Sequence, residues 1–170
     1  MKISTLCFLK NDEHILLGMK KRDFGKGRWN GIGGKVEDGE NIKVAAIREL
    51  QEEVGVICRE VDLEQVAVLK FRSDNQKLDW DAHVFFIDTW EGEPVESDEI
   101  LPKWFLKSRL PFSEMWPDDT FWFPYLLSGK SIQGKFTLDA EGRNILEHEI
   151  TEVRFSEQGL PCSLLLTESD

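Results

Sequence analysis

Three glutamates that could bind a divalent cation stand close together in the chain, at Glu49, Glu52 and Glu53. On a helix, residues three and four positions apart are surface neighbours, and like charges there repel by roughly 0.2–0.5 kcal/mol per pair. A solvated face would gain from interleaved lysines, but the nearby cation on this side is Arg48. Carboxylate oxygens are ligands that Mg²⁺ prefers. The pattern indicates a candidate metal site, to which Glu40 could add a carboxylate, although such a run taken alone is more often a solvated acidic face.

A helix over residues 41–54 would position these carboxylates. Apolar residues recur there at helical spacing, and Gly55 follows as a stop. The apolar stripe consists of Val44, Ile47, Leu50 and Val54. On a helical wheel the three glutamates fall on the side opposite this stripe. Ahead of the helix, a cluster of glycines predicts a loop whose backbone approaches another group closely: Gly25, Gly27, Gly31, Gly33, Gly34 and Gly39.

The rest of the pattern predicts a mixed α/β domain. Two short apolar runs, 3–9 and 15–19, flank a turn and predict a β-hairpin. Further elements are expected downstream: strands over 66–71, 82–90 and 101–106, a short helix over 118–127, and a closing hairpin of 136–138 with 145–155. Two or three packed layers of sheet and helix are therefore the expected architecture.

Composition excludes several classes of function. The chain has 170 residues and a net charge of −11, from 21 Lys and Arg against 32 Asp and Glu. Its 11 Phe, 6 Trp and 1 Tyr argue against disorder, and its length suits a single stable domain. The acidic balance argues against a nucleic-acid polymer as partner, because such binding needs clustered Lys and Arg. A polyphosphate ligand would need cations between it and the carboxylates, so we expect a divalent metal.

The cysteines and the N-terminal segment bear on the cellular context. Cys7, Cys58 and Cys162 are odd in number, far apart and without C-x-x-C spacing, which predicts buried thiols in a reducing compartment. The first ten residues are too weakly apolar for a signal peptide. No run approaches the ~18 apolar residues of a membrane span. We therefore expect a cytoplasmic monomer that does not associate with membranes.

A fixed register of residues runs through the acidic segment, and it resembles the Nudix box. The register consists of Gly34, Glu40, Arg48-Glu49-Leu50, Glu52-Glu53 and Gly55-Val56. Every fixed position is matched, and a chance match is expected on the order of 10⁻⁸ per start position. The resemblance implies an α/β/α sandwich with a mixed sheet. It also implies one Nudix domain over residues 1–155, followed by a tail, 156–170, whose role is open.

The resemblance implies a hydrolase in which water attacks a phosphorus of a nucleoside diphosphate linked to another group. Bound Mg²⁺, or Mn²⁺ in its place, would neutralise charge on the phosphoryl oxygens. Glu53 is the first choice for the base, and Glu99 is the runner-up or an additional ligand. The other implied roles are metal ligation by the Gly33 carbonyl, Glu49, Glu52 and Glu53, orientation of a glutamate by Arg48, and closure of the loop on phosphate at Gly34.

Four further segments narrow the resemblance to the MutT type of the family: 16–22, 27–31, 94–99 and 115–119. Enzymes of this type sanitise the nucleotide pool. The resemblance therefore implies hydrolysis of oxidised purine nucleoside triphosphates, such as 8-oxo-dGTP and 2-oxo-dATP, to monophosphate and pyrophosphate. It implies a base pocket and further nucleotide contacts: Asn30, Trp116, Asp118 and Asp119 in the pocket, and Thr5 and Lys20 outside it.

The chemistry of a purine pocket agrees with these positions. Such a pocket needs aromatic walls and a few convergent polar groups. Trp116 and Phe71 could form the walls, while Trp80 stands at the pocket where the family has a smaller residue. We hypothesise that Asp118 and Asp119 share a proton in the complex, which would let one pocket pair with oxidised guanine or oxidised adenine. The alternative is that these carboxylates cap the helix that follows.

Two other functions stay open at this point. The chain could hydrolyse another nucleotide, such as a dinucleoside polyphosphate or a nucleotide sugar. It could also be a nucleotide-binding module without catalysis, but that hypothesis predicts eroded glutamates in the box, and all of them are present.

Overall fold

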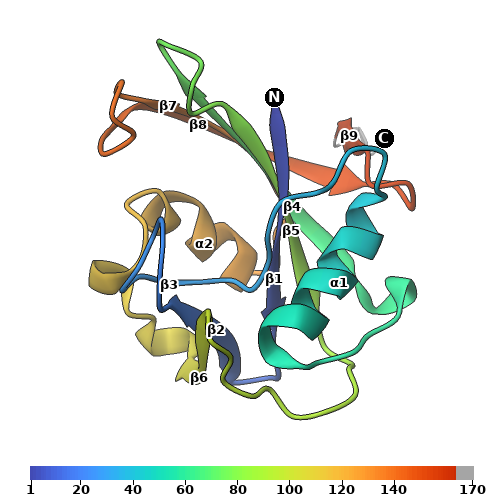
Figure 1. Cartoon of the computed structure of the whole chain (residues 1–170). Helices are drawn as coiled ribbons and strands as arrows, with labels where there is room; N and C mark the ends of the chain where they lie inside the picture. Colours follow the sequence, from blue (N-terminus) through green and yellow to red (C-terminus); the bar gives the residue numbers. More distant parts are fainter. Residues whose placement is uncertain (164–170) are drawn as a thin grey trace, which may run out of the picture.

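Two β-sheets and two α-helices make up the part of the chain that the computed structural model describes, residues 1–163 (Figure 1). The strands are β1 (Lys2–Leu9), β2 (His14–Lys20), β3 (Trp29–Asn30), β4 (Glu64–Ser73), β5 (Trp80–Ile87), β6 (Ile100–Leu106), β7 (Ile132–Leu138), β8 (Ile145–Phe155) and β9 (Pro161–Ser163). The helices are α1 (Ile42–Val54) and α2 (Asp119–Leu127), with single 3₁₀ turns at Glu60–Asp62, Lys107–Arg109 and Phe112–Glu114.

The larger sheet is mixed and has the strand order β1-β5-β4-β7-β8-β9. β1 runs parallel to β5, and β4 runs parallel to β7, while the other neighbours are antiparallel. The smaller sheet has the order β3-β2-β6 and is antiparallel. The mixed sheet agrees with the predicted fold class.

The helices cover opposite faces of the larger sheet, as Figure 1 shows, because the strands are apolar on both faces. Along β1, Phe8 points into the core on the α2 side and contacts the Phe123 ring, with centroids 5.0 Å apart. Its neighbour Cys7 points into the core on the α1 side, together with Leu50 and Val54. Successive side chains of a strand alternate between its faces. The result is the expected three-layer sandwich of helix, sheet and helix.

The predicted hairpin of residues 3–9 and 15–19 is wrong, although both strands exist. β1 and β2 belong to different sheets, and only the bridge between Lys10 and Ile15 joins them at the turn. Asn11 Oδ1 accepts bonds from the backbone N–H groups of Glu13 and His14, at 3.1 and 2.7 Å, and so forms a tight turn. Both strands are buried on both faces, so each completes its ladder with a distant partner instead of with the other.

Helix α1 ends at the predicted residue and begins one residue later than predicted, but its buried face differs from the prediction. Asn41 caps the first turn through its side chain, and Gly55 ends the helix in the left-handed region at φ 74°. Val44 of the predicted stripe is 43% exposed. The buried residues are instead Ala45, Ala46, Leu50, Glu53 and Val54. The small alanines let the helix approach the sheet, which turns Glu53 inward, so Glu53 does not share the solvated side with Glu52.

The downstream elements are close to those predicted, with shifted ends. Strands β4, β5 and β6, helix α2 and the hairpin of β7 with β8 all form. Within the segment 156–170, for which no regular element is expected, residues 161–163 add β9 to the edge of the sheet, and residues 164–170 lie outside the described part. The prediction of three buried thiols is wrong for Cys162, which is exposed; Cys7 and Cys58 are buried. No described helix is long and apolar enough to cross a membrane.

Candidate active site

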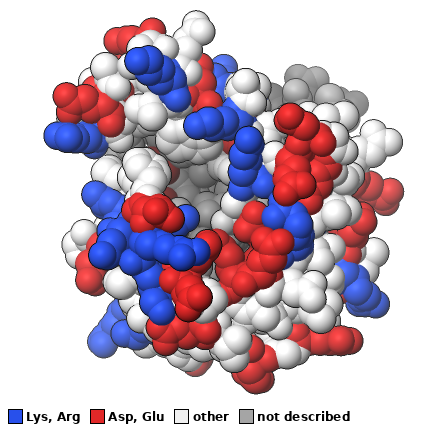
Figure 2. Space-filling model, viewed as in Figure 1, with Lys and Arg blue, Asp and Glu red and all other residues white. Residues whose placement is uncertain are grey.

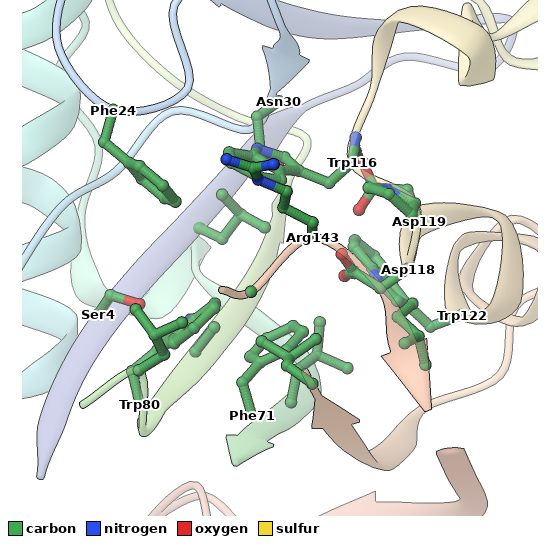
Figure 3. Close-up of a pocket in the computed structure, with 18 of the residues that line it drawn as sticks. Ser4, Phe24, Asn30, Phe71, Trp80, Trp116, Asp118, Asp119, Trp122 and Arg143 are labelled. Atoms are coloured by element: carbon green, nitrogen blue, oxygen red, sulfur yellow. Dashed lines mark hydrogen bonds between the residues drawn. The ribbon is translucent and has the colours of Figure 1, made fainter. Parts of the chain in front are cut away.

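A cavity opens between helix α2, the larger sheet and the loops around residues 21–30 (Figure 3). It is lined by predicted pocket residues from four separate segments: Asn30, Phe71, Trp80, Trp116, Asp118 and Asp119. On the space-filling surface this face has a hollow, and acidic side chains gather beside it (Figure 2). Segments far apart in sequence thus form one pocket.

Aromatic rings form two walls of this cavity. On the sheet, Phe71 stacks on Trp80, with ring centroids 4.3 Å apart and planes 17° apart. On the loop side, the Trp116 and Phe24 rings are in contact, with their centroids 5.2 Å apart. The Arg28 guanidinium carbon lies 4.9 Å from the centroid of the Trp116 ring. Arg28 also donates to the Met115 carbonyl at 2.7 Å. Both walls consist of aromatic rings, which suits a flat apolar ligand held between them.

Two adjacent carboxylic side chains lie at the α2 end of the cavity. Asp118 Oδ2 accepts a bond from the indole Nε1 of Trp122 at 2.8 Å. Asp119 Oδ2 accepts from the Trp116 backbone N–H at 3.1 Å, and its side chain is buried. Asp118 stands at the N-cap of α2, but its side chain makes no capping hydrogen bond. The alternative in which this pair serves as a helix cap is therefore wrong for Asp118.

Burial controls the protonation of this pair. Loss of hydration raises the pKa of Asp118 above its usual value, and it raises that of Asp119 much further, with the neighbouring Asp118 charge adding to the effect. The bonds from Trp122 and from the Trp116 amide act in the opposite direction. Two coupled carboxyls of this kind hold a proton more readily than exposed ones, so the pair can present both a donor and an acceptor.

The acidic face of α1 is organised by Arg48. Its guanidinium donates to both oxygens of Glu40, from Nε at 2.8 Å and from Nη2 at 2.9 Å. Nη1 donates to Glu49 at 2.9 Å and to Glu52 at 3.4 Å, and Nη2 also reaches the Lys35 carbonyl at 3.1 Å. This contact with Arg48 lowers the pKa of Glu40 to about 2. Arg48 therefore holds the preceding loop and the helix carboxylates in one arrangement.

Glu53 is the most buried of the helix glutamates. Its Oε2 accepts a bond from the Gly33 N–H at 3.2 Å. Burial, with a further contribution from the Glu49 charge, raises the pKa of Glu53 to about 7. Burial likewise raises the pKa of Glu49, against the opposing effect of Arg48. Crowded, desolvated carboxylates gain from a cation placed among them.

Hard carboxylate oxygens from one helix fit the chemistry of a divalent metal such as Mg²⁺. Among residues 1–163, no three acidic, cysteine or histidine side chains already converge in a metal-binding arrangement. Arg48 bonds to oxygens of Glu49 and Glu52 that a metal would also need. The donor set therefore fits a metal, provided that these contacts with Arg48 loosen or are shared.

Two glycines make the close approach of the loop to this face possible. A side-chain carbon on Gly33 would lie 2.0 Å from the Thr5 carbonyl oxygen, and one on Gly34 would lie 2.6 Å from the Glu49 carboxyl group. At Gly33 the obstacle is backbone, so only a residue without a side chain fits there, whereas at Gly34 a side chain would displace the Glu49 carboxyl group. The loop is thereby pressed between β1 and α1, with its backbone beside the carboxylates.

Comparison with known proteins agrees with this geometry. The family model described as NUDIX domain matches residues 2–126. The chain belongs to the Nudix family. The segment from Gly34 to Val56 is therefore its Nudix box, and the resemblance seen in the sequence is confirmed.

The curated relatives include two that are called oxidized purine nucleoside triphosphate hydrolase. The one from Danio rerio is 46% identical over 154 residues, which cover 89% of this chain and 96% of the relative. The one from Mus musculus is 42% identical over 153 residues, with 89% and 96% covered. A solved structure of a MutT protein from Bacillus halodurans has a TM-score of 0.76 at 26% identity, covering 88% of this chain and 97% of that one. The predicted Nudix fold is thus confirmed.

The remaining predicted residues lie beside the Nudix box or outside the cavity. Glu99 is paired with Arg22, and its charge acts on both Glu49 and Glu53. The charge of Lys20 acts on Glu53 in the opposite sense. Thr5, predicted as a nucleotide contact, is buried and does not line the cavity. Its backbone N–H donates to the Gly34 carbonyl at 2.9 Å.

Sequence reasoning missed several residues that line the cavity: Ser4, Leu6, Phe24, Leu69, Leu78, Ala82, Pro117, Leu138, Glu141, Gly142, Arg143 and Ile145. Strand alternation could have found Ser4 and Leu6, because they flank Thr5 on β1 and so face the opposite side. No sequence signal distinguishes Phe24 or Arg143, since each reaches the cavity from a loop.

Proposed function

We propose that this protein is a metal-dependent pyrophosphohydrolase of oxidised purine nucleoside triphosphates, with 8-oxo-dGTP and 2-oxo-dATP as substrates and with monophosphate and pyrophosphate as products. The names of the zebrafish and mouse relatives favour this activity. The observation that carries the proposal is the cavity itself. Its aromatic walls lead to Asp118 and the buried Asp119, and acidic side chains gather beside it on the surface.

In this proposal the purine lies between the aromatic walls. Stacking on an aromatic ring contributes about 1–3 kcal/mol per base. At the edge of the base, a shared proton lets Asp118 and Asp119 offer one donor and one acceptor. Asn30, whose Oδ1 already accepts from the Gly31 N–H at 2.9 Å, offers a further polar contact. Such an edge can pair with an oxidised guanine or with an oxidised adenine.

The triphosphate would extend from the cavity toward α1. Glu49, Glu52 and Glu53, with the Gly33 carbonyl, would hold Mg²⁺, for which Mn²⁺ could substitute. The metal would supply neutralisation of charge on the phosphoryl oxygens and a lower pKa for bound water. Lys20 and the Gly34 backbone would contact the phosphates. Positive charge at this point would offset the acidity of the chain as a whole.

Glu53 is the proposed base. It is held in place by the Gly33 N–H, and burial raises its pKa to about 7 in the metal-free protein. A bound metal would lower this pKa and so favour the carboxylate form that a general base needs. Glu99 is the runner-up, and its pairing with Arg22 would have to open before it could serve. Arg48 orients Glu49 and Glu52 and takes no part in proton transfer, since a guanidinium stays protonated.

The test is a hydrolysis panel. The purified protein is treated with a chelator and then supplied with Mg²⁺, Mn²⁺ or no metal. Each sample is incubated with 8-oxo-dGTP, 2-oxo-dATP, dGTP, dATP, a dinucleoside polyphosphate and a nucleotide sugar. Chromatography follows the nucleotide products, and a coupled assay follows pyrophosphate. We expect metal-dependent release of monophosphate and pyrophosphate, fastest from the oxidised purines.

Two outcomes would contradict the proposal. Unchanged turnover after thorough chelation would show that the reaction does not depend on a metal. Faster hydrolysis of the dinucleoside polyphosphate or the nucleotide sugar would move the protein to another substrate class. Gel filtration and localisation of a tagged chain would test two further predictions, that the protein is a monomer and that it is cytoplasmic.

A further inference from the structure

Two turns meet at the mouth of the base cavity. One joins β4 to β5, and the other joins β7 to β8; the strands leading into them pair in parallel up to Ser73 and Leu138. Asn75 Nδ2 donates to the Ala140 carbonyl at 3.4 Å across the two turns. A side-chain carbon on Gly142 would lie 2.7 Å from Leu78 Cδ1, so the turns are closely packed there. The mouth of the cavity therefore has a defined edge.

The β7–β8 turn is held in one conformation by Asp139. Its Oδ1 accepts from the Arg143 N–H at 2.8 Å, and its Oδ2 accepts from Asn144 Nδ2 at 2.7 Å. The Asp139 N–H donates to the Asn144 carbonyl at 3.0 Å, and the Gly142 N–H donates to the Asp139 carbonyl at 3.0 Å. These bonds fix the backbone from which the Arg143 side chain extends.

Arg143 is the single cationic side chain among the described residues that line the cavity; its charged neighbours there are Asp118, Asp119 and Glu141. Figure 3 shows its side chain extending across the opening, toward the side of Phe24 and Trp116. Its ion pair with Glu141 has an Nη1–Oε2 distance of 3.3 Å, and both side chains are largely exposed. Such a pair contributes little, so the guanidinium is available to a ligand.

We propose that Arg143 is a specificity-determining residue that donates to a carbonyl oxygen on the base, at the edge facing away from Asp118 and Asp119. This inference rests on the proposed function and deepens it. A guanidinium has five N–H donors and no acceptor, so it favours an oxo group at this edge and disfavours an amino group. The acidic pair reads one edge of the base and Arg143 reads another.

The variants are Arg143→Met, which keeps the aliphatic stem, and Arg143→Lys, which keeps the charge but not the planar fork. Arg109→Met is the matched control, because it removes one exposed positive charge outside the cavity. We expect Arg143→Met to raise KM for 8-oxo-dGTP roughly tenfold, the loss typical of one charged hydrogen bond, with kcat within about twofold. Arg143→Lys should be intermediate, and Arg109→Met should match the wild type.

Free nucleosides separate a base contact from a phosphate contact. Calorimetry with 8-oxo-2′-deoxyguanosine should show the same proportional loss of affinity in Arg143→Met as the triphosphate shows. Binding of 2′-deoxyadenosine, whose base has no oxo group, should change much less. Melting temperatures of the variants should equal that of the wild type, because the Arg143 side chain is exposed.

Three results would overturn the inference. If the wild type hydrolyses oxidised purine nucleotides but Arg143→Met keeps the same KM, Arg143 is no determinant while the proposed function stands. A loss of affinity for the triphosphate alone would make it a phosphate contact. Equal losses for both nucleosides would remove the preference for an oxo group. If instead the wild type hydrolyses no oxidised purine nucleotide, the proposed function fails, and the nucleoside measurements still test Arg143.

Discussion

Two pairs of carboxylic side chains, Glu49 with Glu53 on α1 and Asp118 with Asp119 at α2, share a chemistry but differ in surroundings. Burial raises the pKa of all four. The α1 pair lies beside Arg48 and near Lys20, with the further carboxylate Glu99 acting on both. The α2 pair lies among indole rings.

The difference shows how neighbours decide the use of a functional group. Arg48 beside Glu49 and Lys20 near Glu53 favour the ionised forms, whereas the neighbouring carboxylates oppose them. A bound cation would shift the balance to the ionised form, which can hold a metal and accept a proton from water. Aromatic surroundings leave Asp118 and Asp119 with little compensation for charge, which favours the protonated form and its hydrogen-bond donor. The first pair suits reaction chemistry, and the second suits recognition.

The largest effect is expected from Glu53→Gln, which removes a charge and a base but keeps the shape. We expect kcat to fall by about 10³-fold, within the range of general-base catalysis, while nucleotide binding stays detectable. Steady-state kinetics and calorimetry with 8-oxo-dGTP measure the two quantities. Glu60→Gln, an exposed glutamate outside the site, is the control. Loss of binding without loss of kcat would assign Glu53 to recognition, and the two pairs would then not differ in function.

Asp119→Ala is expected to act on recognition instead. Removal of a buried hydrogen-bonding carboxyl should raise KM for oxidised purine nucleotides by roughly tenfold to a hundredfold, with a smaller change in kcat. The control is Asp98→Ala, which removes a carboxylate from a different loop. Asp139→Ala would be a poorer control, because it would disturb the mouth of the cavity. The comparison between the pairs fails if Asp119→Ala lowers kcat as much as Glu53→Gln does.

The aromatic walls should have smaller effects. We expect Phe24→Ala and Trp80→Ala each to raise KM about tenfold through lost stacking, because one ring remains on the opposite side in either variant. The effect of Trp80→Ala should extend to stability, since its ring is stacked on Phe71, whereas Phe24 is 75% exposed. Kinetics and thermal melting distinguish the two. An unchanged KM in both variants would show that the purine base does not bind in this cavity.

The smallest effect is the pH dependence of folding. The pKa of Asp119 is raised above its usual value near 3.8 in the folded chain, so the folded state binds the proton more tightly than the unfolded state. Its contribution to stability is full below that usual value and is lost as the pH rises through the raised pKa. We expect Asp119→Asn, which cannot ionise, to lose less stability than the wild type as the pH rises.

Thermal melting of the metal-free protein at several pH values checks this prediction. If the melting temperatures of the wild type and Asp119→Asn change in parallel with pH, ionisation of the Asp119 carboxyl does not lower the stability of the fold. Activity offers a second check. If the pair shares a proton in the complex, rates with 8-oxo-dGTP and 2-oxo-dATP should diverge between about pH 6 and 9, and parallel profiles would count against a shared proton.

The local features of this protein could be predicted from its sequence. Helix α1 has its cap at Asn41 and its stop at Gly55, and both depend on contacts within a few residues. The register of the Nudix box is equally local, because the helical repeat sets the spacing of Glu49, Glu52 and Glu53. Most strands were predicted for the same reason, because a short apolar run is visible within a few residues.

The partners of these elements and the state of the site residues were decided only by the tertiary structure. β1 pairs with β5, nearly eighty positions away, so no local turn signal could select that partner. The inward turn of Glu53 follows from how α1 packs on the sheet, and the approach of Phe24 and Arg143 to one cavity follows from how distant loops meet. Hydrogen bonding between neighbours is short-range, whereas desolvation and strand pairing depend on segments that become adjacent only on folding.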